Sequence, residues 1–408
     1  MDVAIDKNTR WPLVRLGDVC EIINGLWKGE KPPLQSVAVI RNANFEKDGS
    51  LDYSDVVTID VEVSKFSKRK LKYGDIILEK SGGGPNQPVG RVVLFEKKEG
   101  DYSFSNFTFA IRVNNNVEIH FRYLYHFLRW VYSSGQTIEM QNNSTNIRNL
   151  DAEKYRNILI PLPPLAEQQR IVARLDAAFA AIAEASAAAE ANLRNARALF
   201  DSYLDQVFST RGAGWVERRL GDVAALNYGY TESATYERIG PQFLRITDIQ
   251  ENRVDWETVP FCRIESNEFR KYQILHNDIV FARTGATTGK SYLVQNPPYA
   301  VCASYLIRLR LLESDVSAPF VYLFFQTSDY WSTIGSGVSG SAQGGFNASK
   351  LADLLIPFPI DKVIQNNIVE LSMQVYQNTL EVENIYKQKI TALTELKQSL
   401  LAEVFGAA

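Results

Sequence analysis

The chain has 408 residues, 45% apolar and 22% charged, which is enough to bury more than one hydrophobic core and excludes a disordered protein. Its formal net charge of -3 excludes the overall basic character common in nucleic-acid-binding proteins, so any such binding must be local. Three widely spaced cysteines, a polar N-terminus and the lack of any run near the roughly 18 apolar residues of a membrane span favour a protein of the reducing cytoplasm.

The first predicted region covers residues 1–160 and has mixed α+β character. Short apolar runs such as DIILEK and FAIRV, bounded by Gly, Pro and Asn, predict strands and turns. FRYLYHFLRWVY, from Phe121, has the apolar spacing of a helix. The prolines of ILIPLPP, from Ile158, mark the change from strand to helix, because proline is tolerated near a helix start but not inside one.

A long spacer helix is predicted next, over residues 161–210. No glycine or proline occurs from Leu165 to Arg211, and the apolar residues follow the 3/4 spacing of a coiled-coil seam. The many alanines between Ala173 and Ala198 favour a helix and allow a partner helix to approach closely. The partner is expected to be the second long helix of the same chain, with an intermolecular coiled coil as the alternative.

The second half of the chain repeats this order. A second globular region is predicted over residues 211–357, with FVYLFFQTSDYW, from Phe320, as its helix. A second long helix is predicted over residues 358–408. Its seam is expected to hold Ile364, Ile368, Leu371, Val375, Val382, Ile385, Leu396 and Leu400.

An internal duplication explains this order, because sequence blocks of the first half return in the second half. LGDV occurs at Leu16 and again at Leu220, and R-x-x-N at Arg41 returns as R-x-x-D at Arg245. Asp75, before a predicted strand, returns as Asp278. The predicted fold is therefore α+β, with two similar globular domains, two long antiparallel coiled-coil helices and a pseudo-two-fold internal repeat.

These residues resemble the specificity subunit of type I restriction-modification systems over essentially the whole length. The RLGDV openings, the R-x-x-N/D blocks, the Asp75 and Asp278 blocks and IPLPPLAEQQRIV at Ile160 carry the resemblance. The last motif is the most specific. The second copy departs from it, because IPFPIDKVIQNNIV has Asp361 and Lys362 where the first copy has Ala166 and Glu167.

The resemblance implies a DNA-recognition role without catalysis. Such subunits hold two target-recognition domains apart on an antiparallel helix pair, and each domain reads half of a split, asymmetric site in double-stranded DNA. Two modification (methyltransferase) subunits that bind S-adenosylmethionine methylate adenine, and restriction subunits that use ATP and Mg²⁺ cleave the DNA. A helix of the predicted length would extend roughly 70 Å, about two turns of B-DNA, so the helices would act as a ruler.

Three enzyme-like patterns suggest an alternative function, a standalone nuclease or methyltransferase, but each pattern is incomplete. GATTGKS, from Gly285, has one residue too few for a phosphate-binding loop. NPPY, from Asn296, follows no glycine-rich turn of a doubly wound sheet that could bind S-adenosylmethionine. Asp75 with Glu96 and Lys97 has the outline of a metal-dependent nuclease, but the second copy keeps only Asp278. We therefore expect no catalytic residue and no metal site in this chain.

The candidates for DNA contact are polar residues of glycine-rich or amide-rich loops, because Arg, Lys, Asn and Gln can bond base edges. In the first domain they lie on SGGGPNQ and QNNSTNIR: Lys80, Ser81, Asn86, Gln87, Gln141, Asn142, Asn146 and Arg148. Their second-domain counterparts are Arg283, Thr284, Thr287, Lys290, Ser341, Gln343, Asn347 and Lys350. Arg41 and Arg245 are further candidates, although their matching places in both copies also fit a structural role. The basic segment from Val61 to Lys98 could contact phosphates, or be a solvated charged face.

A third class of function is a duplicated coiled-coil adaptor that does not touch nucleic acid. It shares the long helices and the repeat with the DNA-recognition subunit, and only a DNA-binding measurement separates the two.

Overall fold

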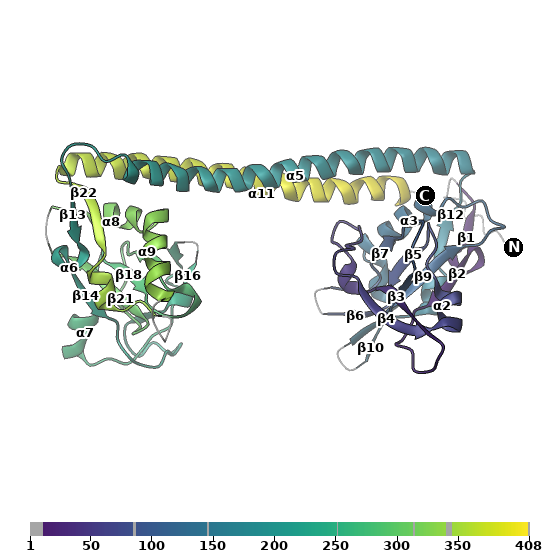
Figure 1. Ribbon diagram of the computed structural model, residues 1–408, viewed down its shortest axis with the longest axis horizontal. Coiled ribbons are helices and arrows are strands. Elements are labelled where there is room, and N and C mark those ends of the chain that lie inside the picture. Colours follow the sequence, from purple (N-terminus) through teal and green to yellow (C-terminus); the bar gives the residue numbers. More distant parts are fainter. Residues whose placement is uncertain are drawn as a thin grey trace. The chain divides into compact units, whose positions relative to one another are not determined.

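The computed structural model describes residues 11–84, 87–144, 147–250, 252–312, 315–339 and 345–406. The chain divides into two compact units (Figure 1). Unit 1 contains residues 1–189 and 388–408, and unit 2 contains residues 190–387. Each unit therefore combines one globular region with part of both long helices. No helix in these described ranges is both long and apolar enough to cross a membrane.

The globular region of unit 1 is built around an antiparallel sheet of strand order β2-β9-β5-β7. Strand β3 pairs antiparallel with β4 and parallel with β8, and the chain's first strand, β1, pairs with the last strand of the region, β12. The elements are β1 Leu13–Arg15, α1 Leu16–Val19, β2 Cys20–Asn24, β3 Leu34–Ile40, η1 Asn42–Asn44, β4 Val57–Glu62, α2 Val63–Arg69, β5 Ile76–Glu79, β6 Ser81–Gly83, β7 Val92–Leu94, β8 Tyr102–Phe104, β9 Thr108–Val113, α3 Phe121–Ser133, η2 Gln136–Met140, β10 Gln141–Ser144, β11 Ile147–Leu150, α4 Ala152–Arg156 and β12 Leu159–Pro161.

The globular region of unit 2 repeats this plan with the sheet β14-β21-β18-β19. Strand β15 pairs parallel with β20, and β13 pairs with the last strand, β22. The elements are β13 Trp215–Arg219, α6 Leu220–Val223, β14 Ala224–Tyr228, β15 Gln242–Leu244, η3 Ile246–Asp248, β16 Ile249–Gln250, β17 Arg253–Val254, α7 Ser266–Tyr272, β18 Ile279–Ala282, η4 Gly285–Thr287, β19 Ser291–Leu293, β20 Ala300–Cys302, β21 Leu306–Leu311, α8 Ala318–Phe324, α9 Ser328–Ser339, α10 Ala348–Ala352 and β22 Leu355–Pro359.

The two long helices, α5 Leu165–Ser209 and α11 Lys362–Phe405, confirm the predicted spacer helices. Helix α5 starts directly after two prolines, and the Asp361 carboxylate caps α11 by accepting from the backbone N–H of Val363 at 2.8 Å. The divergent motif of the second copy therefore supplies its own helix start. Within each unit the helices are antiparallel partners: Phe179 lies beside Lys397 in unit 1, and Phe200 packs on Tyr376 in unit 2.

The seam of α11 matches the predicted one only in part, because Ile368 and Leu400 pack against the hydrophobic cores as expected but other predicted residues do not. Ile364, Leu371 and Ile385 are exposed, whereas Ser372 and Thr379 are buried. The prediction chose the largest apolar residues, but the alanine-rich helix α5 approaches closely and favours small side chains on its partner. The long helix α11 therefore keeps an apolar face that neither globular region covers.

The LGDV blocks form matching first turns that join the start of each globular region to its end. The backbone N–H of Leu16 donates to Ile158 at 2.9 Å, and that of Leu220 donates to Leu354 at 2.8 Å. A Cβ at Gly17 would lie 3.2 Å from Cβ of Arg156, and one at Gly221 would lie 2.8 Å from Cβ of Ala352. Glycine is used in both copies because the short helices α4 and α10 pass too close for a side chain.

Asp75 and Asp278 are buried, and each forms a bidentate ion pair with an arginine of the neighbouring strand. Arg112 donates to the two carboxylate oxygens of Asp75 at 2.8 and 2.6 Å. Arg310 does the same to Asp278, at 2.7 Å to each oxygen. Both carboxylates also accept a backbone N–H three residues earlier in the chain, at 2.7 Å. The repeated aspartate therefore fixes the turn that precedes the central strand of each sheet.

Gln168 and Gln365 anchor the first turn of each long helix to the globular region. The Gln168 amide accepts the backbone N–H of His120 at 2.8 Å and donates to Glu118 and Pro163, both at 2.9 Å. Gln365 makes the corresponding bonds at 2.9, 2.7 and 2.8 Å to Ser317, Asp315 and Pro359. Both amides are fully buried and fully bonded. This glutamine explains why the motif IPLPPLAEQ stands at the border of strand and helix.

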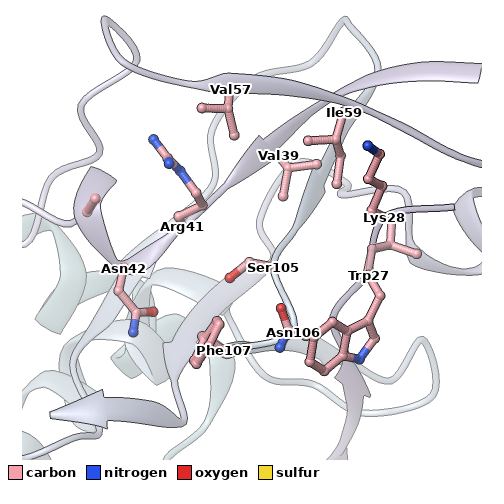
Figure 2. Close-up of a pocket in the computed structure, with 12 residues that line it drawn as sticks. Trp27, Lys28, Val39, Arg41, Asn42, Val57, Ile59, Ser105, Asn106 and Phe107 are labelled. Carbon is pink, nitrogen blue, oxygen red and sulfur yellow. The ribbon is translucent and has the colours of Figure 1, made fainter.

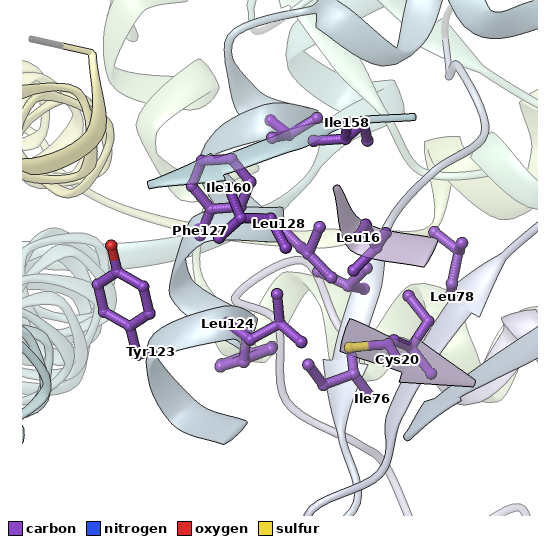
Figure 3. Packing of buried hydrophobic residues seen from close by; sticks show 14 of the residues in the cluster. Leu16, Cys20, Ile76, Leu78, Tyr123, Leu124, Phe127, Leu128, Ile158 and Ile160 are labelled. Atoms are coloured by element: carbon purple, nitrogen blue, oxygen red, sulfur yellow. The ribbon is translucent and has the colours of Figure 1, made fainter. Parts of the chain in front are cut away.

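The core of unit 1 joins the sheet, α3 and the long helices (Figure 3). Leu16, Ile76 and Leu78 pack against Leu124 and Leu128 of α3, and Ile158 and Ile160 of the last strands close the cluster. The C-terminal residues Leu401 and Phe405 enter the same core, where Phe405 meets the rings of Tyr123, Phe127 and Trp130.

The helix predicted from Phe320 is interrupted. Helix α8 ends at Phe324 and α9 starts at Ser328, whereas its counterpart α3 is continuous. The Thr327 hydroxyl donates to the Phe324 carbonyl at 2.7 Å and accepts the Tyr330 N–H at 3.3 Å, so it ends one helix and caps the next. Threonine at such a place competes with the backbone bonds of a continuous helix.

Candidate nucleic-acid interface

The structure brings the two predicted DNA-contact loops of unit 1 together in one sheet. Strands β10 and β11 form a hairpin, and β11 pairs with β6, so that Arg148 lies opposite Gly83 and Asn149 opposite Ser81. Figure 1 shows β6 and β10 at the same end of the unit, and β11 lies between them in the sheet. Ser81 and Asn149, which are 68 positions apart in the sequence, therefore share one sheet. Asn86 and Asn146 lie outside the described residues.

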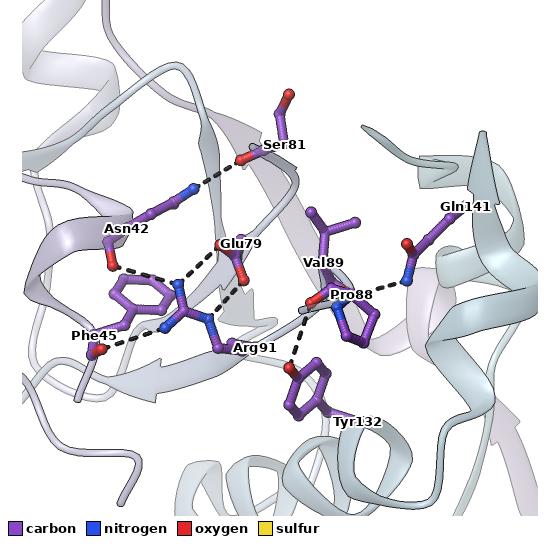
Figure 4. A network of polar contacts seen from close by, with 9 residues as sticks. All are labelled: Asn42, Phe45, Glu79, Ser81, Pro88, Val89, Arg91, Tyr132 and Gln141. Atoms are coloured by element: carbon purple, nitrogen blue, oxygen red, sulfur yellow. Dashed lines mark hydrogen bonds and ion pairs between the residues drawn. The ribbon is translucent and has the colours of Figure 1, made fainter. Parts of the chain in front are cut away.

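Several of the predicted residues on this sheet have structural partners. Lys80 donates to the Asn24 side chain at 3.1 Å and lies over the Phe109 ring, and partial burial lowers its pKa. Ser81 is buried, and its hydroxyl donates to Asn149. The Gln141 amide donates to the carbonyls of Val89 and Thr137 at 3.2 and 3.1 Å (Figure 4). Ser81 and Gln141 therefore hold the sheet in place.

Asn142, Gln87 and Arg148 lie nearer to solvent. Asn142 and Gln87 are exposed, and Arg148 is half-buried in β11. The Gln87 amide lies beside the guanidinium of Arg91. These three side chains are therefore the more solvent-accessible of the described candidates around the hairpin sheet.

Arg91 joins the end of β5 to the turn η1 (Figure 4). Its guanidinium donates to both carboxylate oxygens of the buried Glu79, at 2.7 and 2.9 Å. It also donates to the carbonyls of Phe45 and Asn42, at 3.3 and 3.4 Å. The ion pair with Glu79 raises the pKa of Arg91 despite the burial of the side chain. Arg91 belongs to the basic segment of the sequence, but its guanidinium is paired with the buried Glu79 inside the fold.

The rest of the basic segment is also partly neutralised. Lys65 pairs with Glu62 at 2.9 Å, and Lys70 pairs with Asp101 at 2.6 Å. Lys97 and Lys98 lie over the rings of Tyr53 and Tyr73. The net positive charge of the segment in the sequence therefore overstates the field that it presents to DNA phosphates.

Arg41 and Arg245 occupy matching places before the turns η1 and η3. Arg41 donates to the backbone carbonyl and the carboxylate of Asp55 at 3.1 and 3.2 Å. Arg245 makes a bidentate pair with Asp248, at 3.0 and 2.7 Å, which raises its pKa. Both backbone N–H groups are bonded by the side chain three residues later. The two arginines therefore stabilise a repeated turn, which is the structural role that their matching places in both copies suggested.

In unit 2, the candidates also come together, although they use other elements. Arg283 follows β18, donates to the Ser304 carbonyl at 3.0 Å and lies over the ring of Tyr228. Its own carbonyl accepts the N–H of Phe346 at 2.9 Å, which brings the segment that starts α10 beside it. Thr284 and Thr287 are exposed around the turn η4, and Lys290 is half-buried.

Asn347 and Lys350 have clear structural roles at α10. The Asn347 side chain caps the helix by accepting the backbone N–H of Lys350 at 2.9 Å. The Lys350 ammonium donates to the Gly337 carbonyl at 2.7 Å. Ser341 and Gln343 lie outside the described residues.

The enzyme-like patterns do not assemble an active site. GATTGKS forms the three-residue turn η4 and leads into a strand, whereas a phosphate-binding loop must open a helix. NPPY is a turn in which Asn296 has a φ of 43° and Tyr299 stacks on Phe269. Asp75 and Asp278 are saturated by arginine, as described above. No cluster of three or more metal-ligating side chains occurs in the described part of the chain.

The cysteines are unreactive as placed. All three are buried, and burial raises the pKa of Cys20 to about 12, of Cys262 to about 11 and of Cys302 to about 12. The reactive species of cysteine is the thiolate, which these environments disfavour.

A cavity in unit 1 escaped the sequence analysis. It has a volume of about 340 Å³ and lies between the segment after β2, the strands β3 and β4, and the turn before β9 (Figure 2). Trp27, Arg41, Asn42, Ser105, Asn106 and Phe107 are among its lining residues. The sequence signal that could have indicated it is a tryptophan in a glycine-flanked loop, GLWKG, where no core position is expected.

The family model for the type I restriction modification DNA specificity domain matches this chain twice, over residues 8–190 and 213–392. The specificity subunit of the type I restriction enzyme EcoKI of Escherichia coli K12 is 23% identical over 384 residues, 89% of this chain and 80% of that protein. Two solved structures share the fold. A chain from work on complex assembly and conformational transition of a type I R-M system has a TM-score of 0.77 at 20% identity, with 97% of both chains covered.

The second structure is the HsdS subunit of Thermoanaerobacter tengcongensis, with a TM-score of 0.56 at 19% identity, over 97% of this chain and 96% of that chain. The duplicated fold, the paired long helices and the twofold match to the family model agree. The chain belongs to the type I restriction-modification DNA specificity family and is a specificity (S) subunit with two DNA target-recognition domains.

Proposed function

We propose that this chain reads a split, asymmetric site in double-stranded DNA, one half with each globular region, and that catalysis is supplied by its partners. The observation that carries the proposal is a repeated framework with unlike surfaces. Asp75 and Gln168 recur as Asp278 and Gln365 with the same bonds. The candidate surfaces do not recur: unit 1 has a hairpin sheet where unit 2 has the turn η4 and the helices α9 and α10.

Two copies of one fold with different surfaces suit the reading of two different sequences. Base edges are discriminated by the kind of donor or acceptor that faces them. Asn142, Gln87 and Arg148 are the more solvent-accessible of the described candidates in unit 1, and Thr284 and Thr287, with the half-buried Lys290, surround the turn η4 in unit 2. An amide-rich surface and a hydroxyl-rich surface would read different bases, so the target would be asymmetric.

The absence of catalysis is part of the proposal. Its support is that each carboxylate of the nuclease-like pattern is held by an arginine: Asp75 by Arg112, and Glu96 by Arg122. A carboxylate in such a pair is a poor ligand for Mg²⁺, because binding the ion would require breaking the ion pair. S-Adenosylmethionine, ATP and Mg²⁺ would then act on the partner subunits.

Two modification subunits and the restriction subunits are the proposed partners. The outward face of α11 supports a docking role. It carries Ile364, Leu371, Val382 and Ile385, which are exposed apolar residues at near-heptad spacing, and Leu396 lies further along the helix. Such a stripe suits a partner helix, because a long surface helix normally presents polar residues to solvent.

The principal experiment is the genomic methylation pattern left when this chain is co-expressed with its methyltransferase partner. We expect a motif of two short halves with a constant gap. Exchange of residues 211–357 for the corresponding region of another family member should change one half only. A continuous motif, or a change in both halves, would refute the proposal.

A second experiment tests the absence of catalysis. The purified chain, incubated with DNA and Mg²⁺ or with labelled S-adenosylmethionine, should neither cut nor methylate. Asp75→Asn is a matched variant for any activity that is found, because a nuclease that uses this carboxylate would lose it. Turnover by the chain alone would support the standalone enzyme. A gel-shift assay in which the chain and its modification partner bind no DNA would support the adaptor.

A further inference from the structure

The cavity beside Trp27, introduced above, has the size of a small-ligand site. Its volume of about 340 Å³ is at the lower end of the roughly 300–1,000 Å³ that such sites usually enclose. That space suits a single planar ring system and is too small for a folded peptide segment. Figure 2 shows Trp27 and Lys28 on one side of the cavity, Arg41 and Asn42 on the other side, and Ser105, Asn106 and Phe107 between them.

Two aromatic side chains of the cavity are left open to solvent. Trp27 is 71% exposed and Phe107 is 46% exposed. Their neighbours Val39, Val57 and Ile59 add an apolar floor. An exposed aromatic side chain in a concave site is typical of binding surfaces, where the ring face stacks against a flat ligand. The cavity therefore offers ring faces to a planar molecule.

Three residues that line the cavity have side-chain atoms without partners. Arg41 Nε, Asn42 Oδ1 and Ser105 Oγ are buried, and none of them has a hydrogen-bond partner among the described residues. Ser105 is 8% exposed. Nearly all buried polar atoms in folded proteins are bonded, so three unbonded atoms on residues around one cavity suit side chains that turn toward a ligand when it binds. They offer two donors and one or two acceptors, which fits the edge of a nucleobase.

The same place in unit 2 lacks this chemistry. Ser105 bridges to Leu26, as Ala303 bridges to Tyr230 in unit 2, so Ser105 corresponds to Ala303. By the same alignment Trp27 corresponds to Thr231. Asn42 follows the repeated arginine before η1, and its counterpart before η3 is Ile246. By the same alignment Phe107 corresponds to Tyr305, which is also exposed, so unit 2 keeps one ring but lacks the indole of Trp27, the amide of Asn42 and the hydroxyl of Ser105.

We propose that the cavity receives one nucleobase of the DNA target, taken out of the base stack. The face of the base lies against Trp27 and Phe107, and its edge bonds Ser105, Asn42 and the Nε of Arg41 after these side chains turn toward it. Stacking on aromatic side chains together with bonds to the base edge is how proteins hold unstacked bases. The inference rests on the proposed function, because it needs the first unit to contact DNA, and it identifies a specificity-determining site within that contact.

The experiment uses the full chain in complex with its modification subunits. The half-site of the first unit is the half of the methylation motif that stays unchanged when residues 211–357 are exchanged. Each base pair of that half-site is replaced in turn by a mismatch. One series changes the base of one strand, and the second series changes the base of the other strand. A base that leaves the stack costs less to extract when it is unpaired. We expect tighter binding, on the order of tenfold, for mismatches at one position other than the adenine that the modification subunits methylate, because methyltransferases also extrude their target base.

Two variants test the residues. Trp27→Ala should weaken binding to the paired site on the order of tenfold and abolish the gain from the mismatch. Because Trp27 is mostly exposed, its removal should leave the melting temperature unchanged. Ser105→Ala should weaken binding without lowering the melting temperature, since its hydroxyl has no partner to lose. Thr231→Ala, at the corresponding place in unit 2, is the control and should bind like the wild type.

The inference is overturned if no mismatch in that half-site tightens binding, or if Trp27→Ala binds the paired site as the wild type does. In either case the proposed function still holds, provided that the wild-type complex prefers the split site to unrelated DNA. If the wild-type complex shows no such preference, the proposed function fails, and the inference fails with it.

Discussion

The two globular regions have the same framework but different surfaces. In both, a buried aspartate holds the central strand, and a buried glutamine holds the start of a long helix. Outside this framework, unit 1 has a cavity lined by Trp27 and Phe107 and a hairpin sheet. Unit 2 has an interrupted helix, and Arg283 lies there over the ring of Tyr228. The comparison teaches that the repeated residues are those needed for folding, and that the positions free of this duty can diverge toward different ligands.

The largest expected effect tests the repeated aspartate. Asp75→Ala leaves Arg112 partly buried and unpaired, and loss of one partner of such a pair costs about 3 kcal/mol of unfolding free energy. Asp278→Ala should cost a similar amount through Arg310. Hydrogen exchange should show faster opening in the unit that carries the substitution. Asp55→Ala, which removes a surface partner of Arg41, is the control and should have little effect. Unequal costs at the two aspartates would break the comparison.

The repeated glutamine should have the next largest effect. Gln168→Leu removes three hydrogen bonds and leaves buried backbone groups of His120, Glu118 and Pro163 unbonded, which costs about 2 kcal/mol. Gln365→Leu should behave alike. The exposed neighbours give matched controls, Gln169→Leu and Asn366→Leu, which should leave the midpoint of urea unfolding unchanged. A midpoint that does not move for Gln168→Leu would show that the anchor is dispensable.

A smaller effect separates folding from recognition at Asn347, which was a candidate for DNA contact. Asn347→Ala removes the cap of α10 and should lower stability by about 1 kcal/mol, whereas Asn347→Ser should keep the cap. If the residue is only a cap, the serine variant will leave the second half of the methylation motif unchanged. A changed half-site in Asn347→Ser, with normal thermal unfolding, would show that the residue also contacts DNA.

The smallest expected effect depends on pH and on one unit only. His126 is buried beside Asp176, and burial lowers the pKa of His126 although the carboxylate opposes this. The unfolded chain therefore binds a proton more readily, so stability should fall as the pH drops below about 6.5. Phe325 fills the corresponding place in unit 2. Urea unfolding at pH 7.5 and 5.5 should show a loss that His126→Gln reduces, and an unchanged pH dependence in this variant would contradict the assignment.

The sequence predicted the framework well because duplication marks residues with a structural duty. The long helices, the continuous helix from Phe121 and the start of the second spacer at Asp361 are found near their expected places. The loops around Ser81 and Asn142 were predicted separately as candidates for DNA contact, and the structure places them in one sheet.

The sequence could not predict features that depend on how closely elements approach. The seam of α11 uses Ser372 and Thr379, because the alanines of α5 leave room only for small side chains. The role of Arg91 depends on Glu79 and on carbonyls of η1 that are distant in sequence. The cavity beside Trp27 was missed because unbonded buried atoms have no signature in a single sequence.

The last turn of α11 belongs to the core of unit 1, where Leu401 and Phe405 pack against α3. The first globular region is therefore completed by residues that the ribosome makes only after the whole second region. Throughout synthesis of the second region, the nascent first region exposes the apolar surface that Phe405 will cover. Cleavage of the chain before the last turn of α11, or a stop codon there, would consequently damage the region encoded by the first half of this sequence.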